Sequence, residues 1–199
     1  MRSAFYLKKY DVAVDEAVKV LNTEKITSQQ TVEAKSIRAK SLCETNRKDE
    51  AVADLKYLTK NAKSELGAEA YFMLADIQYN KKEYKEVEKT VNSLFNYPYT
   101  TAYWSTKAML LMADLYLDKN EEQNAEAVLQ TVIDNTDNEE FKKQAEEKLQ
   151  ALKDKQNLRL ATPVQENMKV EFENKTGGVE LFETKPAVND STNLNVQPN

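Results

Sequence analysis

Residues 100–133, with the sequence TTAYWSTKAMLLMADLYLDKNEEQNAEAVLQTVI, carry the clearest structural pattern in this chain. Small and apolar side chains recur there at helical spacing in two successive stripes. The stripes consist of Met109, Met112, Ala113 and Tyr116, followed by Ala125, Val128, Leu129 and Val132. Between them Asn120, with Gln123 three residues later, is typical of a capped helix start. The segment therefore predicts two antiparallel helices, which need neighbours to cover their apolar faces.

Two earlier copies of this hairpin are visible in the chain. Ala39, Ala75 and Ala113 lie 36 and 38 residues apart. The matching positions of the second helices, Ala51, Val87 and Ala125, show the same two separations. Helical hairpins that repeat at this length pack on their sequence neighbours and form a solenoid. The predicted fold is therefore all-α, an α-solenoid of antiparallel helix hairpins.

The spacing within each hairpin resembles the tetratricopeptide repeat family. That family places large apolar, small and aromatic residues at fixed intervals. The third hairpin offers Met109, Met112, Ala113, Tyr116, Ala125 and Leu129, the second Tyr71, Leu74, Ala75, Gln78, Val87 and Val91, and the first Lys35, Arg38, Ala39, Leu42, Ala51 and Leu55. The resemblance covers residues 1–153 and implies a right-handed superhelix with a protein-binding concave face. The departures are alanine in place of the family's glycine, charges in the first hairpin, and a period above 34 residues.

The predicted repeat domain spans residues 1–155. It contains a partial hairpin at 1–26, hairpins at 28–61, 64–96 and 100–135, and a charged capping helix at 138–155. Residues 156–199 are polar and predicted to be largely disordered; the alternative is a β-hairpin at 168–184, where KVEFEN and VELFET flank a Gly-Gly turn. The short first helix suggests the C-terminal piece of a longer chain, and the alternative is a self-contained N-terminal cap.

The residue composition argues against catalysis. The chain of 199 residues contains no histidine, which removes the commonest general base and metal ligand. No glycine-rich phosphate loop is present, so neither a cofactor nor a metal is expected. A net charge of −5 argues against nucleic acid, and no apolar run is long enough to cross a membrane. The lone cysteine, Cys43, is expected to serve as a small apolar residue between helices.

The run YPYTTAYW at 97–104, together with the acidic, lysine-rich helix after it, is similar to the C-terminal end of long multi-repeat envelope proteins of bacteria. This resemblance implies a periplasmic location. The N-terminal MRSAFYLKKY, however, lacks the apolar core of a signal peptide, which favours the cytoplasm.

In the family, the first helix of each hairpin lines the inner face. This predicts a partner-binding strip made of Phe72, Asp76, Tyr79, Leu110, Asp114 and Leu117. The first hairpin would add Ser36, Lys40 and Cys43. The two aspartates favour a basic protein or peptide partner, and the alternative is two ordinary solvated carboxylates. The predicted function is a non-catalytic interaction scaffold; the alternative is a structural segment of a larger superhelix whose binding site lies elsewhere.

Overall fold

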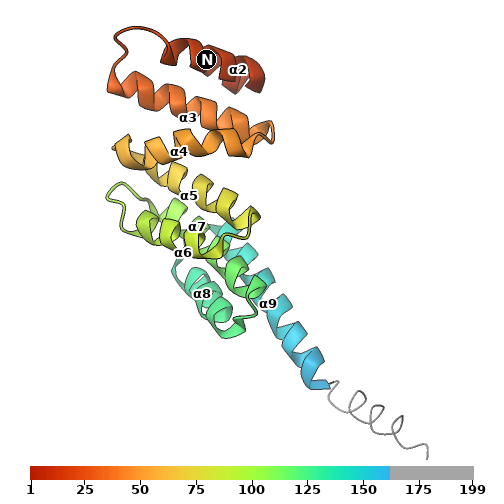
Figure 1. Cartoon of the computed structure of the whole chain (residues 1–199). Helices are drawn as coiled ribbons and strands as arrows, with labels where there is room; N and C mark the ends of the chain where they lie inside the picture. Colours follow the sequence, from red (N-terminus) through yellow and green to blue (C-terminus); the bar gives the residue numbers. More distant parts are fainter. Residues whose placement is uncertain (162–199) are drawn as a thin grey trace, which may run out of the picture. The chain divides into compact units, whose positions relative to one another are not determined.

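The computed structural model describes residues 1–161, and every regular element in this range is a helix (Figure 1). The elements are α1 (Arg2–Tyr6), α2 (Tyr10–Leu21), α3 (Ser28–Glu44), α4 (Lys48–Asn61), α5 (Glu65–Asn80), α6 (Tyr84–Phe95), α7 (Ala102–Asp118), α8 (Glu122–Asn135) and α9 (Glu139–Ala161). The chain divides into two compact units, residues 1–157 and 158–199. The end of α9, which runs past the predicted residue 155, is the described part of the second unit. The remainder of the predicted tail, including the alternative β-hairpin at 168–184, lies outside the described residues.

Within the first unit, helices that follow one another in sequence pack against each other. α2 packs on α3, α3 on α4, α4 on α5, and α5 on α6, while α7 contacts both α5 and α6 and is joined by α8 (Figure 1). The predicted hairpins 28–61, 64–96 and 100–135 correspond to α3–α4, α5–α6 and α7–α8. The all-α prediction is confirmed for the described residues.

α3, α5, α7 and α9 each begin after a residue whose side chain can cap a helix. These residues are Thr27, Ser64, Thr101 and Asn138, each 37 residues after the last. Thr27 forms a complete capping box with Gln30, and the Asn138 side chain accepts a hydrogen bond from the Phe141 amide at 3.0 Å. By this spacing, α9 occupies the place of the first helix in a further repeat.

The turns inside the hairpins share one geometry, which corrects the prediction for Asn120. Lys8, Asn46, Lys82 and Asn120 all have left-handed backbones, with φ between 56° and 60°. After each, a backbone N–H returns to the carbonyl five residues earlier, as Glu121 does to Tyr116 at 2.8 Å. This is the Schellman ending of a helix. Asn120 therefore ends α7 and does not cap α8, because asparagine tolerates the left-handed conformation that this ending requires.

Replacing Lys82 by glycine is expected to stabilise the protein. A lysine at φ 59° carries the Cβ penalty of the left-handed region, on the order of 1 kcal/mol, which glycine does not. The matched control is Lys85→Gly, three residues later in the helical part of α6, where glycine should cost about 1 kcal/mol. Urea denaturation of both variants measures the difference; a Lys82→Gly variant as destabilised as Lys85→Gly would contradict the turn assignment.

Three clusters of buried apolar side chains form the core, one after another along the stack. The repeated alanines Ala39, Ala75 and Ala113 are all completely buried. So are the matching residues of the second helices, Ala51, Val87 and Ala125. The small residues of the repeat thus lie where helices pack, and the stability of the stack comes mainly from apolar area removed from water.

The connection between α6 and α7 is filled by an aromatic side chain that reaches back one hairpin. The hydroxyl of Tyr97 donates a hydrogen bond to the carbonyl of Ala62, and the ring covers Gly67 near the start of α5. A Cβ added at Gly67 would overlap that ring. Gly67, the only glycine among the described residues, is therefore explained by the close approach of Tyr97.

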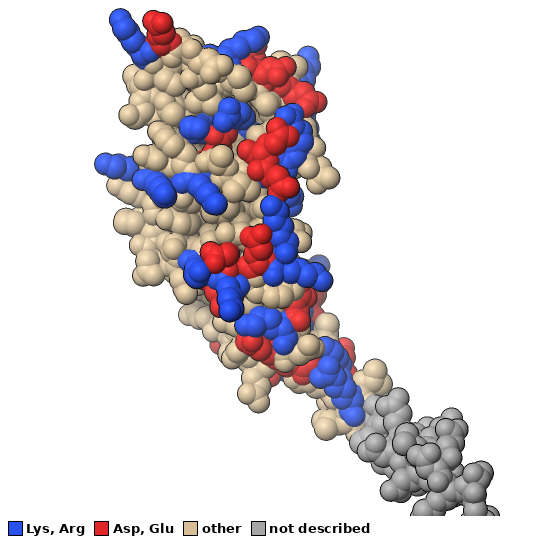
Figure 2. Space-filling view, viewed as in Figure 1, with Lys and Arg blue, Asp and Glu red and all other residues tan. Residues whose placement is uncertain are grey.

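A series of ion pairs joins successive hairpins along one edge of the first unit. In each, an acidic residue near the start of a hairpin's second helix meets a basic residue from the hairpin that follows. The pairs are Asp11–Arg47 at 3.7 Å, Asp49–Lys81 at 2.5 Å, Glu88–Lys119 at 3.1 Å and Glu122–Lys155 at 3.3 Å. Figure 2 shows acidic and basic side chains interspersed along the side that carries the hairpin turns. Exposed pairs of this kind contribute ~0–1 kcal/mol each, so they support the stack without dominating it.

Candidate functional site

The two aspartates of the predicted strip are each paired with a lysine from another helix. Lys48, at the start of α4, donates to the Asp76 carboxylate at 3.0 Å. Lys148 of α9 donates to the carboxylate of Asp114. Each aspartate therefore has a cationic neighbour about one repeat away in sequence. Both ion pairs are partly exposed, and an acidic strip that binds a basic partner stays a prediction.

The four other predicted residues are also engaged inside the molecule. Leu110 is 5% exposed and belongs to the third core cluster, so its side chain cannot line an open surface. The Tyr79 hydroxyl donates to Asp118 at 2.9 Å, and its burial together with this bond raises the pKa of Tyr79. Phe72 is half-buried against Trp104, with ring centroids 5.6 Å apart, and Leu117 is also partly buried. Leu110 thus belongs to the core, and Phe72 and Tyr79 join α5 to α7.

Lys107 lies among the aromatic rings between α5 and α7. Its ammonium nitrogen is 4.8 Å from the ring centre of Phe72, 5.2 Å from that of Trp104 and 5.6 Å from that of Tyr103. Trp104 donates its indole N–H to Glu65 at 2.9 Å. A lysine already occupies the cage, so the cluster serves as an internal cation–π contact that braces α7 on α5.

An open groove lies elsewhere, at the N-terminal end of the first unit. It has a volume of about 840 Å³ and is bounded by α1, α3, the end of α4, and the connection into α5. Its lining residues are Arg2, Phe5, Tyr6, Ser28, Gln29, Val32, Glu33, Ser36, Ile37, Lys40, Tyr57, Lys60, Asn61, Lys63, Ser64 and Leu66. The volume is within the range of ligand-binding pockets. Ser36 and Lys40, which the inner-face pattern of the first hairpin includes, are part of it.

The groove carries a positive charge excess. Four of its lining residues are basic and one, Glu33, is acidic. Arg2 pairs with Glu33, and Lys40 pairs with Glu69 of α5 at 2.5 Å. Lys60 and Lys63 are exposed and have no ion-pair partner within residues 1–161. The ammonium groups of Lys60 and Lys63 are therefore available to bind an anionic ligand.

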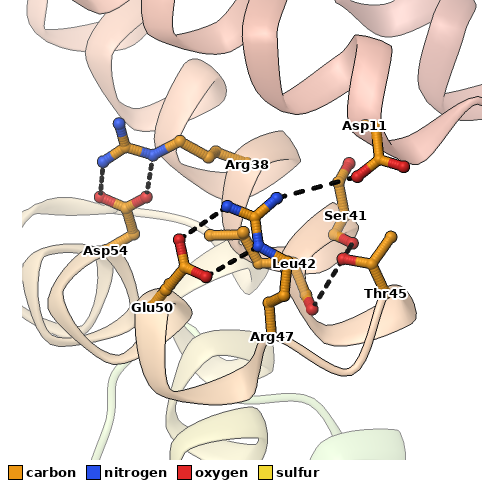
Figure 3. A network of polar contacts seen from close by, with 8 residues as sticks. All are labelled: Asp11, Arg38, Ser41, Leu42, Thr45, Arg47, Glu50 and Asp54. Atoms are coloured by element: carbon orange, nitrogen blue, oxygen red, sulfur yellow. Dashed lines mark hydrogen bonds and ion pairs between the residues drawn. The ribbon is translucent and has the colours of Figure 1, made fainter.

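Tyr57, which forms an aromatic wall of the groove, contacts a buried cluster of charged side chains. The Tyr57 ring packs under the ammonium group of Lys35, whose nitrogen is 4.9 Å from the ring centre. The same lysine donates to Asp54 at 2.9 Å. Arg38 donates two hydrogen bonds to Asp54, at 2.6 and 2.7 Å (Figure 3). The Asp54 side chain is 1% exposed, and its hydrogen bonds raise the pKa of the Arg38 guanidinium.

The cluster explains the charged residues that set the first hairpin apart from the repeat pattern. Lys35 and Arg38 stand where the third hairpin has Met109 and Met112, and Asp54 stands where it has Val128. A buried carboxylate satisfied by two cations replaces an apolar contact. In the same hairpin, Figure 3 shows Arg47 between Glu50 and Asp11, so the α3–α4 turn is tied both to its own helix and to α2.

Other reactive or ligand-binding features are few in the part of the chain that the structure describes. Cys43 is half-buried beside the first core cluster, and burial raises the pKa of its thiol. Within residues 1–161, no group of three or more acidic, cysteine or histidine side chains could hold a metal ion. No helix in that range is long and apolar enough to cross a membrane.

No known protein family, curated protein or solved structure matches this chain. Its candidate site therefore depends on the geometry alone. Sequence reasoning missed Lys60, Lys63 and Tyr57 because they belong to the second helix of a hairpin and to the connection after it. A pattern that considers only the first helices does not include them. The composition of the segment 57–63, with two lysines and a tyrosine, is the sequence signal that could have indicated these residues.

Proposed function

We propose that this chain is a non-catalytic interaction protein of the tetratricopeptide-repeat type, and that it binds a protein or peptide segment in the groove between α1, α3, α4 and α5. In this proposal the hairpins wind as a right-handed superhelix, and the groove is the open part of the inner face. The single observation that carries it is the groove itself. It combines apolar and aromatic walls with unpaired cations on its rim.

The lining chemistry supports a peptide ligand over catalysis. Val32, Ile37 and Leu66 offer apolar surface for side chains, and Ser28, Gln29 and Asn61 offer polar groups for a peptide backbone. Proteins built from stacked helix pairs present extended surfaces of this kind to their partners. The groove contains no pair of carboxylates and no nucleophile with an adjacent base, the arrangements that acid–base or covalent catalysis needs.

The alternative role, a structural segment of a larger superhelix, is favoured by a different observation. Tyr6, Leu7 and Val12 are exposed on α1, the turn that follows it and the start of α2. An apolar surface at the end of a repeat stack is where a further repeat would pack. Of these residues only Tyr6 also lines the groove, so variants at other groove positions separate the two roles.

Filling the groove with a tryptophan at position 61 tests the proposed function. Asn61 is exposed on the rim, and its side chain donates to the Tyr57 carbonyl at 2.8 Å. Asn135 ends α8 in the same way, donating to Thr131 at 2.8 Å, far from the groove in sequence. We expect proteins recovered by the parent chain from a lysate of its own organism to be retained by Asn135→Trp and lost by Asn61→Trp.

Unchanged recovery of every partner by a folded Asn61→Trp variant would reject the groove as the binding site. Far-UV circular dichroism and thermal melts verify that both variants fold. The control matters because both substitutions replace an exposed helix-ending asparagine that makes the same backbone hydrogen bond. Any difference between the two therefore reports the groove and not the loss of that bond.

A further inference from the structure

The geometry points to the chemistry of the partner: a chain segment in which side-chain carboxylates alternate with apolar side chains, held by Lys60 and Lys63. This inference rests on the proposed function and adds the ligand class. It also reverses the sign of the charge that the sequence alone suggested for the partner. Three features of the groove support it: the unpaired cations, the apolar walls and the kind of carboxylate that the cations suit.

The first feature is the pair of cations in the groove that have no ion-pair partner. The other ionic side chains of this region are already paired: Arg2 with Glu33, Lys40 with Glu69, and Lys48 with Asp76. Lys60 and Lys63 are three residues apart, at the end of α4 and in the connection that follows. Neither has an acidic partner among residues 1–161, so the rim lacks two negative charges that a ligand can supply.

The second feature is the apolar surface beside those cations. Tyr57 is one turn before Lys60 on α4, and the ammonium group of Lys35 lies over its ring. Phe5 of α1 and Ile37 of α3 line the same groove. A ligand must therefore present carboxylates and apolar side chains close together. An alternating acidic and apolar segment does so, whereas a run of acidic residues alone would leave the walls exposed to water.

The third feature is the kind of carboxylate that the cations would bind. Side-chain carboxylates within a segment fit them better than the carboxylate at a chain terminus. The groove is open to solvent and is bounded by four separate segments. The two lysines present point charges on flexible stems at the rim. Such ammonium groups pair with a carboxylate without the fixed geometry that a planar guanidinium imposes.

Defined peptides test this inference. The ligand is a twelve-residue synthetic peptide that alternates glutamate with leucine, valine and phenylalanine, blocked at both ends and labelled for fluorescence anisotropy. Its counterparts carry glutamine or lysine at every glutamate position. The full chain should bind the glutamate peptide, and Lys60→Gln/Lys63→Gln should weaken binding on the order of tenfold, since two exposed ion pairs contribute about that much. Binding should also weaken as salt is raised.

The matched control is Lys56→Gln/Lys85→Gln, which removes the same charge from two exposed lysines outside the groove. It should bind the glutamate peptide as the parent does. Equal binding of the glutamine peptide, equal loss in both double variants, or binding only of a peptide with a free C-terminal carboxylate would overturn the inference. So would tighter, Lys60- and Lys63-dependent binding of single-stranded RNA of the same length.

The two tests fail separately. If Asn61→Trp loses partners that Asn135→Trp keeps, but the glutamate peptide does not bind, the groove remains a binding site and its ligand class is wrong. If Asn61→Trp also leaves every partner unaffected, the proposed function and the ligand class are both rejected. The inference is supported only if the Asn61→Trp variant and the Lys60→Gln/Lys63→Gln variant both bind the glutamate peptide more weakly than the parent chain does.

Discussion

Asp54→Ala is expected to lower the free energy of unfolding by about 3–5 kcal/mol, the cost of removing one partner from a buried ion pair. The Asp54 side chain is 1% exposed and accepts hydrogen bonds from both Lys35 and Arg38. Its loss leaves two largely buried cations without a counter-charge. Asp49→Ala on the same helix removes an exposed ion pair with Lys81, and there the expected cost is ~0–1 kcal/mol. Urea denaturation followed by circular dichroism measures both.

The third hairpin of the same chain shows which apolar residues could replace the ion cluster without this loss of stability. The third hairpin has Met109, Met112 and Val128 at the corresponding positions. We therefore expect Lys35→Met/Arg38→Met/Asp54→Val to be at least as stable as the parent, since a well-packed apolar set often matches or exceeds a buried ion cluster. A triple variant as unstable as Asp54→Ala would show that the cluster stabilises the fold beyond satisfying its own charges. The triple variant also removes the lysine that packs over the Tyr57 ring, so its peptide affinity reports whether the cluster positions the groove wall.

Gly67→Ala is expected to lower the free energy of unfolding by about 1–3 kcal/mol, although alanine favours a helix more than glycine does by about 1 kcal/mol. The reason is steric, since the new methyl group would overlap the Tyr97 ring and displace its hydroxyl from the Ala62 carbonyl. In a Tyr97→Ala background the methyl group has room. There, the same Gly67→Ala change should be neutral or stabilising.

The control background is Tyr99→Ala, which removes the ring that stacks edge-on with Tyr97 at 5.6 Å but leaves Tyr97 in place. Gly67→Ala should remain destabilising in that background. The coupling energy between positions 67 and 97 comes from the complete double-mutant cycle, measured by urea denaturation. A coupling near zero would mean that Gly67 is present for a reason other than the approach of Tyr97.

Much of the fold could be predicted because its signals are local. The apolar stripes in residues 100–133 and the repeated alanines led to the hairpins 28–61, 64–96 and 100–135. The capping side chains of Thr27 and Asn138 accept hydrogen bonds from amides only three residues away. Asn120 was misjudged because asparagine suits both a helix start and a left-handed helix end, and only the backbone geometry distinguishes the two.

The candidate site was predicted much less well, since it depends on neighbours about one repeat away. Asp76 and Asp114 have the spacing of an inner strip, but Lys48 and Lys148 neutralise them from other helices. Leu110 matches the strip in register and yet lies in the core. Lys35 and Arg38 depart from the repeat pattern in sequence, and only the folded chain shows that both pair with Asp54.

The sequence by itself determined that the described chain is helical, where its hairpins begin and how they repeat, because periodicity and capping act over a few residues of the same segment. Only the tertiary structure decided which charges are cancelled and which remain free. It placed Lys60 and Lys63 beside Tyr57, Ile37 and Phe5 from three different helices and a connection. The physical reason is that ion pairing and burial depend on distances between side chains, and packing brings together residues that are far apart in sequence.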